Sequence, residues 1–148
     1  MNEAVKMEVS MLEKLYKNMS MGSDSAIKII EKAKDTEFKK ALTNQLNGYE
    51  SFAEKIKERL HALGYMEKEE GMMAKMGVTI GMTMNTIADS SDSHLAQMTV
   101  EGSTMGITDT LKILRENENT SVSETAVNLA RDIISFEEKN VEKMKKFI

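Results

Sequence analysis

The fold is decided by residues 21–60, which read MGSDSAIKIIEKAKDTEFKKALTNQLNGYESFAEKIKERL. Shifted by 84 positions, this stretch falls without a gap on residues 105–144, MGITDTLKILRENENTSVSETAVNLARDIISFEEKNVEKM. Eleven of the forty positions are identical, whereas chance gives roughly two or three at ordinary residue frequencies. The identical pairs are Met21/Met105, Gly22/Gly106, Lys28/Lys112, Ile29/Ile113, Thr36/Thr120, Asn44/Asn128, Ser51/Ser135, Phe52/Phe136, Glu54/Glu138, Lys55/Lys139 and Glu58/Glu142. A gapless match at one fixed offset predicts a duplicated supersecondary unit.

The composition predicts a single all-helical domain. The chain has 148 residues, no proline and eight glycines, and it is rich in Ala, Leu, Met, Glu and Lys, which all favour helices. That length is enough for one domain with a buried core. There is no cysteine, so the chain carries neither a disulfide framework nor a thiolate site.

The charge pattern excludes some classes of partner. The net charge is −4, with acidic and basic residues interspersed, whereas a nucleic-acid binder would show a basic face. Glu3 and Glu8 stand where a signal peptide would have a basic region followed by an apolar run. No stretch reaches the apolar length that a membrane span needs. We therefore expect a cytoplasmic protein without nucleic-acid or membrane partners.

The first copy of the repeat predicts a helical hairpin. Apolar residues recur at three- and four-residue steps over residues 5–33, which indicates one amphipathic helix. Gly22 lies inside it, and because the second copy repeats this glycine as Gly106, we interpret it as a site of close packing and not as a break. A second helix begins after a short turn, with Thr36 as its cap, and ends at Gly64 as its C-cap. So short a connection makes the two helices antiparallel.

The second copy predicts another hairpin, with a helix from near Ser91 to about Asn117. Ser121 and Glu124 have the spacing of a capping box for the last helix. The segment between the hairpins is too long for a turn. Its Gly71–Ala88 stretch is rich in Met and Gly and largely apolar, and we predict that it is a helix. Twenty helical residues cover roughly 30 Å, so such a segment can travel the full length of a neighbouring helix. The predicted architecture is one all-α domain, residues 1–148, in which two duplicated hairpins (2–64 and 91–148) form a four-helix bundle joined by a long crossover helix (65–90).

Three short motifs add to this architecture: His61-Ala62-Leu63-Gly64, Val100-Glu101-Gly102 and Ile134-Ser135-Phe136-Glu137-Glu138. With the two hairpins, they make the chain resemble the ferritin-like superfamily, and most closely its small bacterial rubrerythrin-related proteins and domains of unknown function. The resemblance implies a ferritin-like bundle. In members that carry iron it also implies a di-iron site, with a Glu on two helices and a Glu-x-x-His on the other two.

Residue by residue, this ligand set is incomplete. Glu101 stands where one helix would supply a carboxylate, but the equivalent residue of the first copy is Lys17. The Glu-x-x-His from Glu58 to His61 lies in the last turn of its helix. We interpret that His as a residue that interacts with the C-terminal end of its helix. The resemblance therefore implies the fold without a complete di-iron site.

Three carboxylates are the candidate metal ligands: Glu54, Glu101 and Glu138. The first and last occupy equivalent positions in the two copies, and with Glu101 they would form a cluster for iron or another divalent cation. The other interpretation is that they belong to solvated Glu-Lys faces, because they flank the apolar stripes. On the last helix, Glu137 and Glu138 are followed at three residues by Asn140 and Val141, not by His.

Methionine is unusually frequent, with fourteen residues. Thioethers bind Cu(I), but Met also fills helical cores and interaction surfaces. Without Cys we favour contact with a second subunit over copper, which stays open. Gln45 and Asn140 interrupt the apolar stripes of their helices, and buried polar residues of this kind commonly fix the register of helices.

These patterns lead to two functional hypotheses. No nucleophile–base set, phosphate loop or dinucleotide fingerprint is visible. The first hypothesis is therefore a non-enzymatic structural or interaction protein, homodimeric through the crossover or an exposed hairpin edge, with no cofactor. The alternative is a ferritin-like metal-binding protein that uses the cluster of Glu54, Glu101 and Glu138, with iron as its cofactor.

Overall fold

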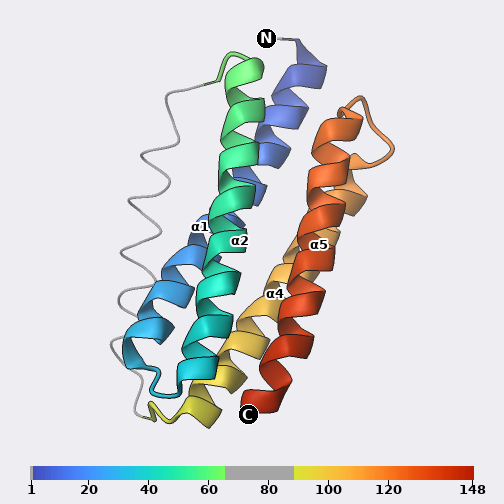
Figure 1. The fold of residues 1–148 in the computed structure, drawn as a ribbon. Coiled ribbons are helices and arrows are strands. Elements are labelled where there is room, and N and C mark those ends of the chain that lie inside the picture. Colours follow the sequence, from blue (N-terminus) through green and yellow to red (C-terminus); the bar gives the residue numbers. More distant parts are fainter. Residues whose placement is uncertain (1, 66–88) are drawn as a thin grey trace.

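The computed structural model describes residues 2–65 and 89–148. In these ranges it has four α-helices, α1 (Glu3–Lys32), α2 (Thr36–Ala62), α4 (Asp92–Asn117) and α5 (Glu124–Met144), followed by a short 3₁₀ helix, η1 (Lys145–Phe147). No strand occurs there. The predicted all-α bundle is thus confirmed at the level of its four helices (Figure 1). None of the helices in these ranges combines the length and the apolar character that a membrane crossing needs.

The helices form two antiparallel hairpins that pack side by side, α1 with α2 and α4 with α5 (Figure 1). The hairpins meet through α1 against α4 and α2 against α5. At one end of the bundle, the Asp92 carboxylate at the start of α4 accepts hydrogen bonds from the backbone N–H groups of Lys34 (2.9 Å) and Asp35 (2.8 Å) in the α1–α2 turn. Helices α2 and α4 therefore start at the same end of the bundle and run in the same direction.

This arrangement places the end of α2 and the start of α4 at opposite ends of the bundle (Figure 1). The predicted crossover helix Gly71–Ala88 lies outside the described residues. What the described residues establish is the direction of the two helices that flank it.

Side-chain caps fix the helix starts, and two of them differ from the prediction. Asp35, not Thr36, caps α2, because its carboxylate accepts from Phe38 N at 2.9 Å. Ser123, not Ser121, caps α5, with its hydroxyl accepting from Ala126 N at 3.3 Å. Burial explains the second shift. Val122 and Val127 belong to the same apolar cluster and occupy the two positions of a hydrophobic staple around that cap.

Gly64, which was predicted to be the C-cap of α2, follows the observed C-cap Leu63 and has a φ of 82°. Its N–H donates to the carbonyl of His61, and the N–H of Tyr65 donates to the carbonyl of Leu60, both at 2.9 Å. These two bonds are those of a Schellman motif, in which the left-handed residue favours glycine.

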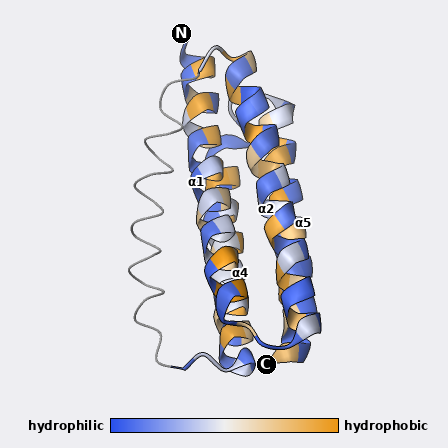
Figure 2. Cartoon of the chain, turned by 60° about the vertical axis from the view of Figure 1, so that its left-hand side comes forward, coloured by the Kyte–Doolittle hydropathy of each residue, from blue (hydrophilic) through white to orange (hydrophobic). Residues whose placement is uncertain are grey.

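Hydrophobic and hydrophilic residues alternate along each helix (Figure 2). Among the described residues, the buried hydrophobic side chains form two apolar clusters. The first lies toward the end of α2 and the start of α1, and includes Leu12, Leu15, Ile56, Leu60, Val127 and Ala130. The second lies toward the α1–α2 turn, and includes Ile29, Phe38, Leu42, Leu95, Ala96 and Met144. Buried polar side chains lie between the two, so the core of the bundle is not apolar along its whole length.

Candidate functional site

A layer of polar side chains separates the two apolar clusters, and we call it the polar layer: Gln45 and Tyr49 from α2, Ser103 from α4, and Glu137 and Asn140 from α5. All five are buried. The Tyr49 hydroxyl donates to Oε1 of Glu137 at 2.7 Å, and Asn140 Nδ2 donates to the same oxygen at 3.1 Å. Gln45 Nε2 donates to the Tyr49 oxygen at 3.0 Å and to Ser103 Oγ at 3.1 Å. Three helices are therefore tied together by one connected network.

Two glycines make room for the Tyr49–Glu137 pair. A Cβ at Gly22 in α1 would lie 2.5 Å from the Tyr49 ring, and a Cβ at Gly106 in α4 would lie 2.6 Å from Oε2 of Glu137. These separations are too short for any side chain. The occurrence of glycine at this position in both copies of the repeat thus has a packing reason. The prediction of close packing at Gly22 is confirmed, since α1 continues through this glycine without a break.

Burial sets the protonation behaviour of this pair. Removal from water raises the pKa of Glu137, although hydrogen bonds from Tyr49, Asn140 and Ser103 act in the opposite direction. Burial and the neighbouring Glu137 carboxylate also raise the pKa of Tyr49, so its hydroxyl keeps its proton and remains the donor. The charged form of Glu137 is costly here because a buried carboxylate loses its hydration.

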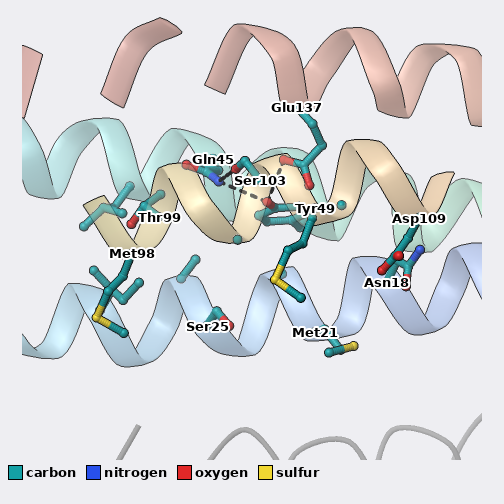
Figure 3. Close-up of a pocket in the computed structure, with 17 residues that line it drawn as sticks. Asn18, Met21, Ser25, Gln45, Tyr49, Met98, Thr99, Ser103, Asp109 and Glu137 are labelled. Atoms are coloured by element: carbon teal, nitrogen blue, oxygen red, sulfur yellow. Dashed lines mark hydrogen bonds between the residues drawn. The ribbon is translucent and has the colours of Figure 1, made fainter. Parts of the chain in front are cut away.

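A pocket of about 390 Å³ opens onto this layer between α1 and α4 (Figure 3). Its size is within the range of ligand pockets, roughly 300–1,000 Å³. Residues from Met98 to Asp109 of α4 line it, which corresponds to about 16 Å of helix at 1.5 Å per residue. The pocket is therefore an elongated groove whose floor is the polar layer.

The walls of the pocket are mostly apolar. The apolar side chains that line it are Met21, Ala26, Ile29, Leu42, Met98 and Met105. Three glycines, at 22, 102 and 106, widen the space between α1 and α4. From the floor, Gln45, Tyr49 and Glu137 contribute polar groups. An apolar cleft with a few convergent polar groups is the usual form of a small-molecule site.

Two polar atoms of this lining have no hydrogen-bond partner within the described residues: Gln45 Oε1 and Asn18 Nδ2. Gln45 is only 4% exposed. An unsatisfied buried acceptor costs free energy, and one that borders a pocket is a natural contact for a ligand.

No family model, curated protein or solved structure matches this chain. Its function therefore has to be inferred from the site.

The three predicted metal ligands are not brought together. Glu54, Glu101 and Glu138 are all exposed. Glu54 pairs with Lys57 at 3.6 Å, and Glu101 accepts a hydrogen bond from Gln97 at 3.1 Å. Across the two described ranges, no group of three or more His, Cys, Asp or Glu residues is arranged to hold a metal ion.

The polar layer does not fit the di-iron centre that the resemblance implies. It offers one carboxylate, that of Glu137, and the residue three positions later is Asn140, a position at which the implied motif has His. Glu138, by contrast, is rotated by about 100° around the helix from Glu137, because an α-helix has 3.6 residues per turn. This rotation turns it to solvent.

A functional role for Tyr49 and Ser103 was not predicted from the sequence, and neither was the burial of Glu137. A usable signal was present in the differences between the two copies. Each residue of the polar layer has an apolar residue 84 positions away: Gln45/Leu129, Tyr49/Ile133, Ser103/Met19, Glu137/Ala53 and Asn140/Ile56. Four of these apolar counterparts are buried in the first cluster, and the fifth, Ala53, packs against it. Identical positions such as Glu54 and Glu138 instead lie on the surface.

Proposed function

We propose that this chain is a non-enzymatic, ferritin-like helical bundle that binds a small organic molecule in the pocket between α1 and α4. The proposal includes a bundle of two duplicated hairpins with a crossover between them. It is supported by the 84-residue repeat and by the end of α2 and the start of α4 lying at opposite ends of the bundle (Figure 1). Cytoplasmic location and homodimerisation remain predictions from the sequence.

The observation that carries the binding function is the position of the polar layer. A helical bundle is most simply stabilised by a continuous apolar core. Here the core is interrupted by five buried polar residues and by a pocket, and the equivalent positions of the other copy are apolar. Polar groups at these positions are therefore not required by the fold itself.

The chemistry of the layer favours binding over catalysis. Tyr49 keeps its proton because of the raised pKa. Oε1 of Glu137 already accepts two hydrogen bonds. These groups are held rigidly by their neighbours, as in a binding site that is largely formed before its ligand arrives.

A neutral probe tests the proposal. Saturation-transfer difference NMR with 1-hexanol should give a signal with the wild-type chain, because the alkyl group fits the apolar walls. Gly102→Leu should abolish this signal, since Gly102 lines the pocket and a Cβ there meets nothing within 4 Å. The first atom of the new side chain therefore has free space beside the pocket.

The matched control is Thr108→Leu, which adds a leucine to an exposed position of α4 outside the pocket. It should keep the hexanol signal. The proposal fails if neither 1-hexanol nor a charged compound with the same hexyl body gives a signal with the wild-type chain, or if both variants affect the signal equally.

A further inference from the structure

Among the described residues that line the pocket, the carboxylate of Glu137 has no cationic partner. Its hydrogen-bond partners are the uncharged Tyr49, Asn140 and Ser103. Of the 17 residues that line the pocket, none is Lys, Arg or His, and the charged ones are Glu137 and Asp109. A buried carboxylate is stabilised by an opposite charge within a few ångströms. Nothing in the described lining provides one.

The directions of the hydrogen bonds leave a second acceptor next to this carboxylate. Because the Tyr49 hydroxyl donates to Glu137, its oxygen accepts from Gln45 Nε2. The second hydrogen of the same amide nitrogen goes to Ser103 Oγ. Both amide hydrogens are then used, and Gln45 Oε1 is left without a donor. The orientation of the Gln45 amide thus follows from the acceptor role of Glu137.

We propose that the natural ligand is an organic cation, a primary amine with a short apolar body, whose ammonium group is held by Glu137 and Gln45. This inference rests on the proposed function and specifies its ligand class. An ammonium group has three hydrogens to donate and no lone pair. The ammonium group supplies the positive charge that the Glu137 carboxylate lacks as a partner, and it supplies a hydrogen-bond donor for Gln45 Oε1.

The shape of the pocket agrees with such a ligand. Oε2 of Glu137 lies where a side chain at position 106 would be, since a Cβ at Gly106 would come within 2.6 Å of it, and Glu137 also lines the pocket. The apolar body would lie between Met21, Met98 and Met105, whose thioether side chains adapt to ligand shape. Asp109, exposed at the pocket, adds a second negative charge that favours the approach of a cation.

An anionic ligand fits poorly, because among the described lining residues it would meet two carboxylates and no basic group. Asn18 does not discriminate between the alternatives, since its carboxamide can both donate and accept. The remaining competitor is a neutral donor such as an alcohol, which would satisfy Gln45 but leave the charge of Glu137 unpaired.

Three probes with the same hexyl body separate these ligands: hexylammonium chloride, 1-hexanol and sodium hexanoate. Each is titrated into the wild-type chain by calorimetry at pH 7.5 and constant ionic strength. We expect hexylammonium to bind about ten- to a hundredfold more tightly than hexanol, the range of a hydrogen bond to a charged group. Hexanoate should bind least tightly.

Glu137→Gln and Glu138→Gln form a matched pair, because both remove one negative charge from neighbouring positions of α5, one buried and one exposed. Glu137→Gln should reduce hexylammonium binding to the level of hexanol and leave hexanol unchanged. Glu138→Gln should leave both unchanged. The near-equal size of Gln and Glu limits the risk that the first variant misfolds.

The inference is overturned if hexylammonium and hexanol bind equally to the wild-type chain, or if the two variants lose hexylammonium binding to the same extent. In those cases hexanol binding alone would keep the proposed function. Failure of all three probes would overturn the proposed function together with this inference.

Discussion

The Tyr49 hydroxyl on α2 donates a 2.7 Å hydrogen bond to Glu137 on α5, between the two apolar clusters of the bundle. Each member of this pair occupies space left by a glycine, Gly22 for the ring and Gly106 for the carboxylate. The two glycines are equivalent in the 84-residue repeat, whereas Tyr49 and Glu137 are not equivalent to each other. The contact between Tyr49 and Glu137 therefore does not follow from the symmetry of the repeat.

Replacing Tyr49 with Phe should destabilise the chain. The variant keeps the edge-to-face contact with Phe136, whose ring centroid is 5.1 Å from that of Tyr49, but it removes the donor to Glu137 and the acceptor for Gln45. Leaving buried polar groups unsatisfied costs about 1–3 kcal/mol. Urea denaturation should show this loss in the free energy of unfolding. An unchanged free energy would mean that the hydrogen bond contributes nothing.

Glu137→Gln should have the opposite effect at neutral pH. Burial raises the pKa of Glu137 in the folded state, so folding favours the protonated form. The contribution of this group to stability is therefore greatest at low pH and is lost as the pH rises through the folded-state pKa. Gln keeps an acceptor without the charge.

The midpoint of urea denaturation should thus be higher for Glu137→Gln than for the wild-type chain at pH 7.5. The difference should shrink as the pH falls toward 4 and Glu137 takes up a proton. A difference that stays constant, or one that grows at low pH, would contradict the raised pKa.

The Glu8–Arg59 pair should respond to pH in the other direction. Glu8 on α1 accepts from Arg59 Nε on α2 at 2.5 Å and from Ser123 N, before α5, at 3.1 Å. Burial raises the pKa of Glu8, but the hydrogen bonds from Arg59 and Ser123 together outweigh it, and the pKa lies below its ordinary value of 4.5. This contribution is present above the ordinary pKa and is lost as the pH falls through the folded-state pKa.

Glu8→Gln should accordingly reduce the free energy of unfolding at pH 7 by about 1–3 kcal/mol, the range for hydrogen bonds to a charged group. As the pH falls from 4.5 through the lower folded-state pKa of Glu8, the difference from the wild-type chain should diminish. Thermal unfolding at several pH values measures both effects. A loss of equal size at pH 3 and pH 7 would contradict this assignment.

Two glycine-to-alanine substitutions should change stability with opposite signs. At Gly102 a Cβ meets nothing within 4 Å, so Ala should stabilise α4 by about 0.5–1 kcal/mol, its advantage over Gly inside a helix. At Gly22 a Cβ would overlap three atoms of the buried Tyr49 ring. The resulting strain should destabilise the chain by about 1–3 kcal/mol. Chemical denaturation measures the free energy of unfolding of both variants. Equal effects would show that the Tyr49 ring does not pack closely against Gly22.

The helices were predictable from the sequence because an apolar period runs along them and because the repeat relates residues 21–60 to residues 105–144. The caps were less predictable. In the segment around Val122, two serines stand at plausible positions, and burial of the valine decides which of them begins α5. At α2, both Asp35 and Thr36 are suitable N-cap residues. Asp35 is the N-cap because its carboxylate accepts the hydrogen bond from Phe38 N.

The site was harder to predict because the repeat drew attention to identical residues. Glu54 and Glu138 are retained in both copies, but both lie on the surface. Glu137 stands next to Glu138 in the sequence and differs from it only in the direction of its side chain. Its partner Tyr49 comes from the other hairpin, 88 residues away, and no local pattern specifies such a contact.

The most direct test of the binding pocket uses the methionines that line it. In a spectrum of the chain labelled with [¹³C]methyl-methionine, the methyl signals of Met21, Met98 and Met105 report on the pocket. Those of Met11 and Met144 report on buried positions outside it. When 1-hexanol and then hexylammonium are added, we expect the three pocket signals to shift and the other two to stay in place. If neither probe moves the pocket signals, or if the shifts are equally large at Met11 and Met144, the pocket is not a binding site.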